Sequence, residues 1–436
     1  MSHTEAAQRG PVATGPRVRA EPFYTSSPFE PVLDPVERLD DIDLTDPELY
    51  LRGDPHAAWL LLRNEAPVFW HEKGMAGTDG RGFWAITHHE DFMRVLRDSG
   101  TFSSTNSPLL DFTADAFAGG STSLANLDPP RHTQLRRLIQ RFITPRAVAQ
   151  WEGEIRGVVD QLVDRIADQG ECDFARDVAL HLPASALAAF IGLNPEQNEA
   201  VAGLNESLHN ATTPEELGKF TAQGLELFES IIEERRDAVP DDIVGAIMTG
   251  EIDGSRLDHT EVLFYLWQLF IGGLDTTVHA ANSAMLSLFH HPDQLALLED
   301  EPLSLGPVGT EELLRWTSVS QHLKRRALKD TVVAGQPVAA GDYVVIFQPS
   351  ANRDAAVHQD PFRLDLRRPT AAPATFGHGT HLCPGLHLAR LELRLLFEGL
   401  FSRLSNFEQT GPAVRGTTFT ILLSPIESLP VAFRRR

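Results

Sequence analysis

Apolar residues recur at helical spacing through most of the chain. Side chains three and four positions apart share one face of a helix, so this spacing predicts a succession of amphipathic helices. The expected helices cover residues 54–65, 90–98, 134–142, 150–168, 180–191, 195–208, 215–238, 241–248, 260–289, 311–316 and 386–404. Short apolar runs predict strands at residues 68–70, 82–86, 332–333, 343–347, 419–423 and 431–433. The expected fold class is therefore mainly α with small β-sheets.

No linker or internal repeat divides the chain. Residues 1–25 lack apolar periodicity and the apolar core of a signal peptide, so we expect a disordered arm there and a single domain over residues 26–436. Residues 104–122 are polar, Gly-rich and aperiodic, which predicts a long loop of the kind that carries function. The most apolar run, residues 262–274, is shorter than the roughly 20 residues that cross a bilayer and predicts a buried helix.

The charge and cysteine content exclude several classes of protein. Lys and Arg number 38 against 60 Asp and Glu, a net charge of −22, which disfavours nucleic acid as a partner because phosphate contacts need a basic surface. The chain has two cysteines, Cys172 and Cys383, so a disulfide framework is not expected and the reducing cytoplasm is the natural location. We expect a monomer that binds neither nucleic acid nor membrane.

Residues 376–385, FGHGTHLCPG, place one cysteine just before an amphipathic helix. Gly377 and Gly379 allow a tight turn and a close approach to a flat ligand, and Gly385 lets the helix begin beside it. The helix dipole and the free N–H groups favour Cys383 as a thiolate. A lone thiolate suits an axial haem ligand better than zinc, which needs three or four ligands. The alternative is a small buried side chain with no chemical role.

The helix expected at residues 260–289 contains Gly272 and Gly273, followed by Asp275 and Thr276. Glycine inside a helix costs about 1 kcal/mol relative to alanine. The two glycines are therefore expected where something approaches the backbone, or where the hydrogen-bond ladder opens, as at a π-bulge. From the residues alone, an ion-paired Asp and a Thr bonded to its own helix explain this pair as well as a chemical role does.

Five positions of the cysteine loop have the spacing of the haem-binding signature of the cytochrome P450 superfamily: Phe376, Gly379, His381, Cys383 and Gly385. The resemblance covers nearly the whole chain from about residue 46, and it is to the soluble bacterial class. It implies a single-domain P450 fold with haem b between the 260–289 helix and the cysteine loop. Cys383 is then the ligand of the iron, and the activity is that of an oxygen-dependent monooxygenase.

The resemblance also implies roles for other residues. Asp275 and Thr276 match the family's acid–alcohol pair, which delivers protons during oxygen activation. The haem site is expected to include the loop residues just named and Gly272, with four cations at the propionates: His132, Arg136, Arg325 and His381. Three further residues match a buried scaffold ion-pair network rather than the chemistry: Glu312, Arg315 and Arg368.

An apolar small molecule is the expected substrate, such as a polyketide, terpenoid or steroid-like metabolite. Gln268 and Gly272 share a helix face with Thr276, so Gln268 is expected to face the substrate, with Ile271 beside it. Gln321 and Leu422 are expected to complete the pocket. Electrons are expected from NAD(P)H through an external ferredoxin reductase and ferredoxin, which would dock on a patch of four arginines: Arg136, Arg137, Arg141 and Arg146.

Pro384 departs from the family pattern, because a residue with an N–H group usually follows the cysteine. The missing donor would leave the thiolate more electron-rich, a hypothesis that the haem reduction potential of Pro384→Leu tests. Peroxide-using relatives also have proline here but lack the acid–alcohol pair. Three alternatives remain: a peroxide-using relative, a haem-thiolate sensor without turnover, and an unrelated helical protein with a structural cysteine.

Overall fold

The computed structural model describes residues 36, 38–51, 55–105, 107–113, 122–211, 213–369, 373–415 and 425–436. The expected arm at residues 1–25, the strand at residues 419–423 and most of the tip of the 104–122 loop lie outside these residues. In the described part, no helix combines the length and the apolar character needed to cross a membrane.

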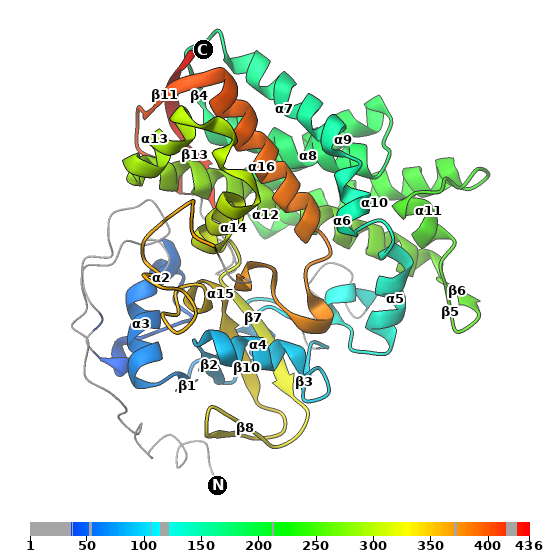
Figure 1. The fold of residues 1–436 in the computed structure, drawn as a ribbon. Coiled ribbons are helices and arrows are strands. Elements are labelled where there is room, and N and C mark those ends of the chain that lie inside the picture. Colours follow the sequence, from blue (N-terminus) through cyan, green and yellow to red (C-terminus); the bar gives the residue numbers. More distant parts are fainter. Residues whose placement is uncertain are drawn as a thin grey trace.

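Helices dominate the described chain (Figure 1). The α-helices are α2 Pro47–Leu51, α3 His56–Glu65, α4 His89–Arg97, α5 Arg131–Ile139, α6 Pro145–Ala149, α7 Glu152–Ile166, α8 His181–Phe190, α9 Pro195–Asn210, α10 Pro214–Arg235, α11 Ile243–Met248, α12 His259–His290, α13 Pro292–Asp300, α14 Gly306–Thr317, α15 Gln348–Ala351 and α16 Leu386–Arg403. Shorter turns are η1 Leu39–Asp41, η2 Ala76–Thr78, η4 Leu124–Asn126, η6 Pro302–Ser304, η7 Ala374–Phe376, η8 Gly379–His381 and the π-helical η5 Phe174–Ala179.

Small sheets accompany the helices. The strands are β1 Val68–His71, β2 Phe83–Ile86, β3 Phe102–Ser103, β4 Glu171–Asp173, β5 Glu251–Ile252, β6 Ser255–Arg256, β7 His322–Ala327, β8 Thr331–Val333, β9 Gln336–Val338, β10 Tyr343–Phe347, β11 Leu404–Gln409, β12 Val414–Arg415, β13 Ile426–Ser428 and β14 Pro430–Arg435. The largest sheet has the order β1-β2-β10-β7-β3. Strand β10 is parallel to β2 and antiparallel to β7, which places Arg325 opposite Val344 near the centre of the sheet.

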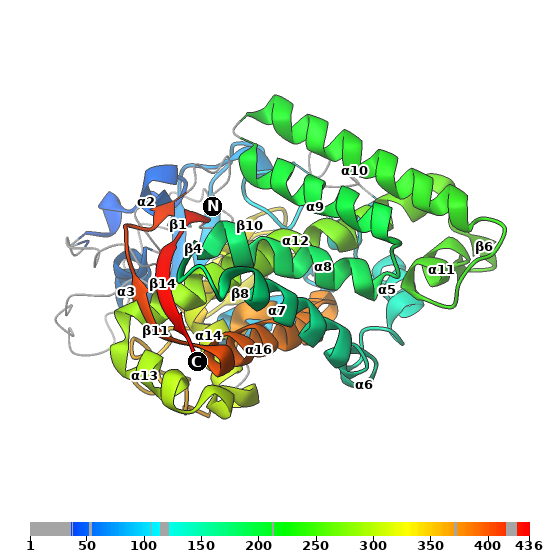
Figure 2. The same cartoon turned by 90° about the horizontal axis from the view of Figure 1, so that it is seen from above.

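Helix α12 is the central element of the helical part. It packs against α8, α10, α14 and α16, and α9 and α10 lie together over α8 and α12 (Figure 2). Its start is fixed by a capping box, in which the Asp258 side chain accepts from the Glu261 N–H and the Glu261 side chain accepts from the Asp258 N–H. The predicted helix at residues 260–289 therefore differs from α12 by one residue at each end.

Candidate active site

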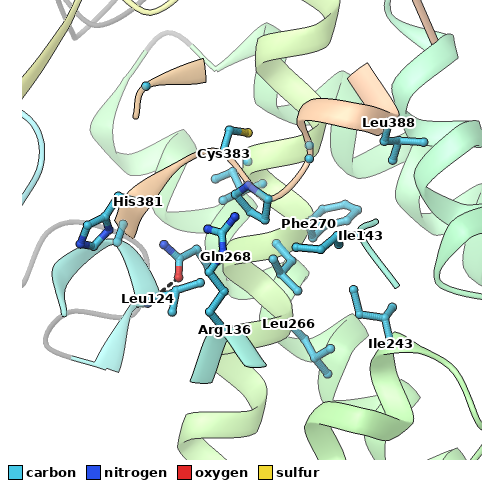
Figure 3. Close-up of a pocket in the computed structure, with 18 of the residues that line it drawn as sticks. Leu124, Arg136, Ile143, Ile243, Leu266, Gln268, Phe270, His381, Cys383 and Leu388 are labelled. Atoms are coloured by element: carbon cyan, nitrogen blue, oxygen red, sulfur yellow. Dashed lines mark hydrogen bonds between the residues drawn. The ribbon is translucent and has the colours of Figure 1, made fainter. Parts of the chain in front are cut away.

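A cavity of about 300 Å³ lies between α12 and the loop that carries Cys383 (Figure 3). Most of its wall is apolar and comes from α8, α12 and the approach to α16. Seven wall residues have polar side chains: His132, Arg136, Gln268, Arg325, His378, His381 and Cys383. An enclosed apolar space with a few convergent polar groups is the usual form of a small-molecule or cofactor site.

Cys383 is held at the start of α16. Its backbone N–H donates to the Phe376 carbonyl at 3.0 Å, which closes the loop. Burial raises the pKa of the Cys383 thiol above its ordinary value, while the backbone N–H groups of Gly385 and Leu386 and the charge of Arg136 act in the opposite direction. A buried thiol with donors aimed at its sulfur becomes a thiolate when a metal ion binds it. Gly385 and Leu386 thus supply N–H groups where Pro384 has none.

The glycines of the loop have left-handed backbone conformations, with φ +70° at Gly377 and φ +69° at Gly379. A Cβ at Gly379 would lie 2.4 Å from the Leu96 carbonyl oxygen at the end of α4. Gly379 therefore makes a close approach to a neighbouring helix, and it is not on the cavity wall. Phe376 also lies outside the cavity wall, with its ring 4.7 Å from the Arg390 guanidinium.

Gly272 leaves open space on the α12 side of the cavity. A Cβ added there would meet no heavy atom within 4 Å, whereas one at Gly273 would touch Leu187. Helix α12 is continuous through both glycines, so the predicted opening of its hydrogen-bond ladder is not observed. Thr276 Oγ1 donates to the Gly272 carbonyl at 3.0 Å, the bond that a threonine makes to its own helix.

Asp275 points away from this cavity. Its Oδ1 lies 2.9 Å from His279 Nε2 and 3.3 Å from His209 Nε2, and neither Asp275 nor Thr276 is on the cavity wall. Burial acts to raise the pKa of Asp275, but the two histidines outweigh it and the pKa is lowered. Sequence analysis missed both partners. Only His279 had a signal, since it follows Asp275 by one helical turn.

Four cationic or potentially cationic side chains gather at one edge of the cavity, here called the cationic edge: His132, Arg136, Arg325 and His381. The His132 and His381 rings are 4.1 Å apart, and burial together with the neighbouring arginines lowers their pKa values to about 4 and about 2. His132 Nδ1 and His381 Nε2 are buried and, within the described part of the chain, have no hydrogen-bond partner.

The two arginines of the cationic edge indicate which kind of ligand the cavity binds. In the same part of the chain, neither Arg136 nor Arg325 forms an ion pair with a carboxylate, although Arg325 is buried and Arg136 is half-buried. Buried charges without partners are costly, so the edge is suited to a ligand with two carboxylates. A sulfur ligand, apolar faces and this edge together are the donor set that haem requires, and the residues fit that group.

The residues expected to contact the substrate do not all lie on the cavity wall. Gln268 and Ile271 line the cavity, but Gln268 Oε1 already accepts from the Leu124 N–H at 2.7 Å (Figure 3). Gln321 is fully buried and is not on the wall of this cavity. Leu422 lies outside the described residues.

The scaffold residues meet as the sequence predicts. Arg315 makes two bonds to Glu312, at 2.7 and 2.8 Å, and both side chains are 0% exposed. Arg368 Nε lies 3.1 Å from Glu312 Oε1. Arg315 also donates to the carbonyls of Asn352 and Pro361, which ties α14 to the segment that leads to the cysteine loop.

The predicted arginine patch is smaller than expected. Arg136 turns into the cavity and reaches from α5 towards the cysteine loop (Figure 3). Arg141 is paired with Asp241 on the surface. Arg137 and Arg146 are exposed and remain available to a partner.

Comparison with known proteins supports the same family. The family model for cytochrome P450 matches residues 310–427. A putative cytochrome P450 126 of Mycobacterium tuberculosis is 34% identical over 394 residues, which cover 86% of this chain and 94% of that protein. Linalool 8-monooxygenase of Pseudomonas putida is 31% identical and covers 84% of this chain and 93% of that enzyme.

A solved structure extends this similarity to the fold. Mycobacterium marinum cytochrome P450 CYP268A2, in complex with pseudoionone, has a TM-score of 0.82 at 30% identity and covers 91% of this chain and 100% of that one. Similarity of sequence and fold over most of both chains accompanies the cysteine loop, the apolar cavity and the cationic edge. The chain belongs to the cytochrome P450 family and is a haem-thiolate monooxygenase.

Proposed function

We propose that this enzyme hydroxylates an apolar small molecule, such as a terpenoid, steroid-like or polyketide metabolite, between α12 and the cysteine loop. The observation that carries the proposal is the wall itself, which is apolar except for the cationic edge, the cysteine, Gln268 and His378. Two similar proteins support substrates of this class: one is named linalool 8-monooxygenase, and the other was solved in complex with pseudoionone. The amide nitrogen of Gln268 is the polar group on α12 left to contact a substrate oxygen.

Titration of the oxidised enzyme with small metabolites tests the substrate class. We expect apolar terpenoids to bind and to shift the Soret band to shorter wavelength, because they bury their surface against the apolar wall. Charged compounds of similar size, such as aromatic amino acids, are the matched set and are expected to leave the band unchanged. A band that responds only to the charged set would contradict the proposal.

In this proposal the haem is held by the residues already described. Cys383 would bind the iron, and His132, Arg136, Arg325 and His381 would hold the propionates. Bound haem supplies oxygen activation, because a thiolate ligand increases electron density at the iron and favours O–O cleavage. Gly272 keeps space open on the α12 side, and the apolar wall excludes water from it.

Asp275 and Thr276 are proposed to carry protons across α12. Asp275 Oδ1 contacts His209 Nε2, and His209 is part of the wall of a polar pocket. Thr276 Oγ1 sits against the Gly272 carbonyl beside the open space. Rotation of the Asp275 side chain away from its histidines would move a proton from the polar pocket towards the hydroxyl of Thr276.

We expect Asp275→Asn to lower substrate-dependent turnover about 100-fold, since a positioned proton donor contributes about 10²–10⁴-fold to a rate. Thr276→Ala is expected to consume NAD(P)H while forming little product. The rate of product formation measures the first effect and the product yield per NAD(P)H consumed measures the second, and Thr260→Ala, exposed in the first turn of α12, is the matched control. Coupled turnover at the wild-type rate in both site variants would leave the pair without the proposed role.

The electron donor is proposed to be a ferredoxin, reduced by NAD(P)H through a ferredoxin reductase. Exposed Arg137 and Arg146 lie on the α5–α6 side of an otherwise acidic molecule and suit an acidic partner. Charge attraction of this kind weakens with ionic strength, so the reduction rate should fall as salt is added. We propose that this electron transfer takes place in the cytoplasm, where Cys172 and Cys383, both free, stay reduced.

A further inference from the structure

Three possible metal ligands meet beside α12, outside the wall of the cavity that holds Cys383. His209 Nε2, Asp275 Oδ1 and His279 Nε2 all lie within 4.8 Å of one another. The 3.3 Å between Asp275 Oδ1 and His209 Nε2 is close to the roughly 3.4 Å expected between ligands of one tetrahedral zinc ion bound at about 2.0–2.1 Å. The 2.9 Å between Asp275 Oδ1 and His279 Nε2 is a hydrogen bond, which a bound ion replaces. Asp275 and His279 are one turn apart on α12, and His209 comes from the end of α9.

The hydrogen bonds of His209 leave its Nε2 as an acceptor. Its Nδ1 lies 2.9 Å from the Asn205 carbonyl oxygen, which can only accept, so Nδ1 carries the proton. In a neutral ring the Nε2 lone pair then faces the carboxylate oxygen of Asp275. Two acceptors at this distance repel unless a cation lies between them, and burial disfavours the doubly protonated ring. An N–H donated to a backbone carbonyl is also the usual support of a histidine that binds metal.

A polar pocket of about 330 Å³ gives access to this cluster. It lies between η5, α8, α9 and α12, and His209 is part of its wall. The other charged wall residues are Arg176 and three carboxylates, Asp177, Glu206 and Glu427, with His181 beside them. Acidic lining on a chain with a net charge of −22 concentrates cations at the mouth of the pocket.

We propose that His209, Asp275 and His279 bind a Zn²⁺ ion, with water from the polar pocket as its fourth ligand. The ion joins the end of α9 to α12 and fixes Asp275 against His209 and His279. Zinc binding is also expected to inhibit the enzyme, because an Asp275 side chain whose carboxylate is bound to zinc cannot rotate. This inhibition rests on the proposed proton-transfer role of Asp275. The binding itself does not depend on that role.

Equilibrium dialysis of the haem-loaded enzyme against zinc chloride, with bound metal counted by mass spectrometry, tests the binding. We expect His209→Ala and His279→Ala each to lose one bound ion, or to raise its Kd more than about 100-fold, because loss of a supporting contact alone costs 10–100-fold. His181→Ala, a histidine of the same pocket outside the cluster, is the matched control and keeps the ion. The spectrum of the reduced carbon monoxide complex shows which variants fold. If His279→Ala does not fold, zinc binding by His209→Ala alone tests the proposal. Equal zinc binding in wild type and variants overturns the proposal.

Turnover then tests the consequence separately. Zinc at a concentration that fills the site is expected to slow substrate-dependent NAD(P)H oxidation in the wild type at least 10-fold and to leave His209→Ala unaffected. Zinc that binds the cluster without slowing the wild type would refute the inhibitory role while the site stands. Because dialysis requires no turnover, an inactive enzyme that still binds zinc through these residues would count against the proposed function and not against the site.

Discussion

Cys383→Ala is expected to abolish monooxygenase activity and to remove the red-shifted Soret band of the reduced carbon monoxide complex. The sulfur is the one thiol on the cavity wall, and the N–H groups of Gly385 and Leu386 are already aimed at it. The other wall residues that could bind iron are histidines, and His132 and His381 lie at the cationic edge. Alanine therefore leaves no thiolate to raise the electron density at the iron.

Cys172→Ala is the matched control for this experiment. Cys172 lies in β4, is absent from the cavity wall, and has its pKa raised by burial to about 12. A half-buried thiol that stays protonated is a structural side chain, so this variant is expected to keep both the band and the activity. A thiolate-type band that persists in Cys383→Ala, or disappears in Cys172→Ala, would overturn the assignment of the ligand.

Elements that local signals define were predicted well from the sequence, and elements that tertiary contacts define were not. Helix α12 has an apolar pattern and a capping box of its own, so its ends were found within one residue. Strand β7 was missed because its sequence, HLKRRA, carries charges at positions where a strand is buried. Lys324 donates to the Gly77 carbonyl and Arg325 faces the cavity, two contacts that only the folded chain creates.

The same distinction holds in the site. The wall positions of Cys383, Gly272 and Ile271 were predictable, because a loop motif and a helix repeat are local patterns. The contact between Asp275 and His209 was not, since it depends on how α9 packs over α12. The burial of Gln321 was not predictable for a related reason: it precedes β7, a strand that only the folded chain defines.

Glu312→Gln is expected to destabilise the protein by about 3–5 kcal/mol, the usual cost of leaving one member of a buried ion pair uncompensated. Arg315 is 0% exposed, so its charge has no access to water once Glu312 is neutral. Glu312 also accepts from Arg368 and from the Asp365 N–H, and the substitution weakens both contacts. Chemical denaturation of the haem-loaded enzyme measures the loss.

A surface pair separates this effect from the loss of a charge in general. Glu215 and Lys219 are 2.9 Å apart on α10 with side chains 80% and 67% exposed, and Glu215→Gln is expected to cost no more than about 0.5 kcal/mol because water screens the pair. Arg315 bridges α14 to the carbonyls of Asn352 and Pro361, so the damage in Glu312→Gln should reach the cysteine loop and reduce the haem bound per chain. Equal stability and equal haem content in the two variants would mean that the buried network neither stabilises the fold nor supports the haem site.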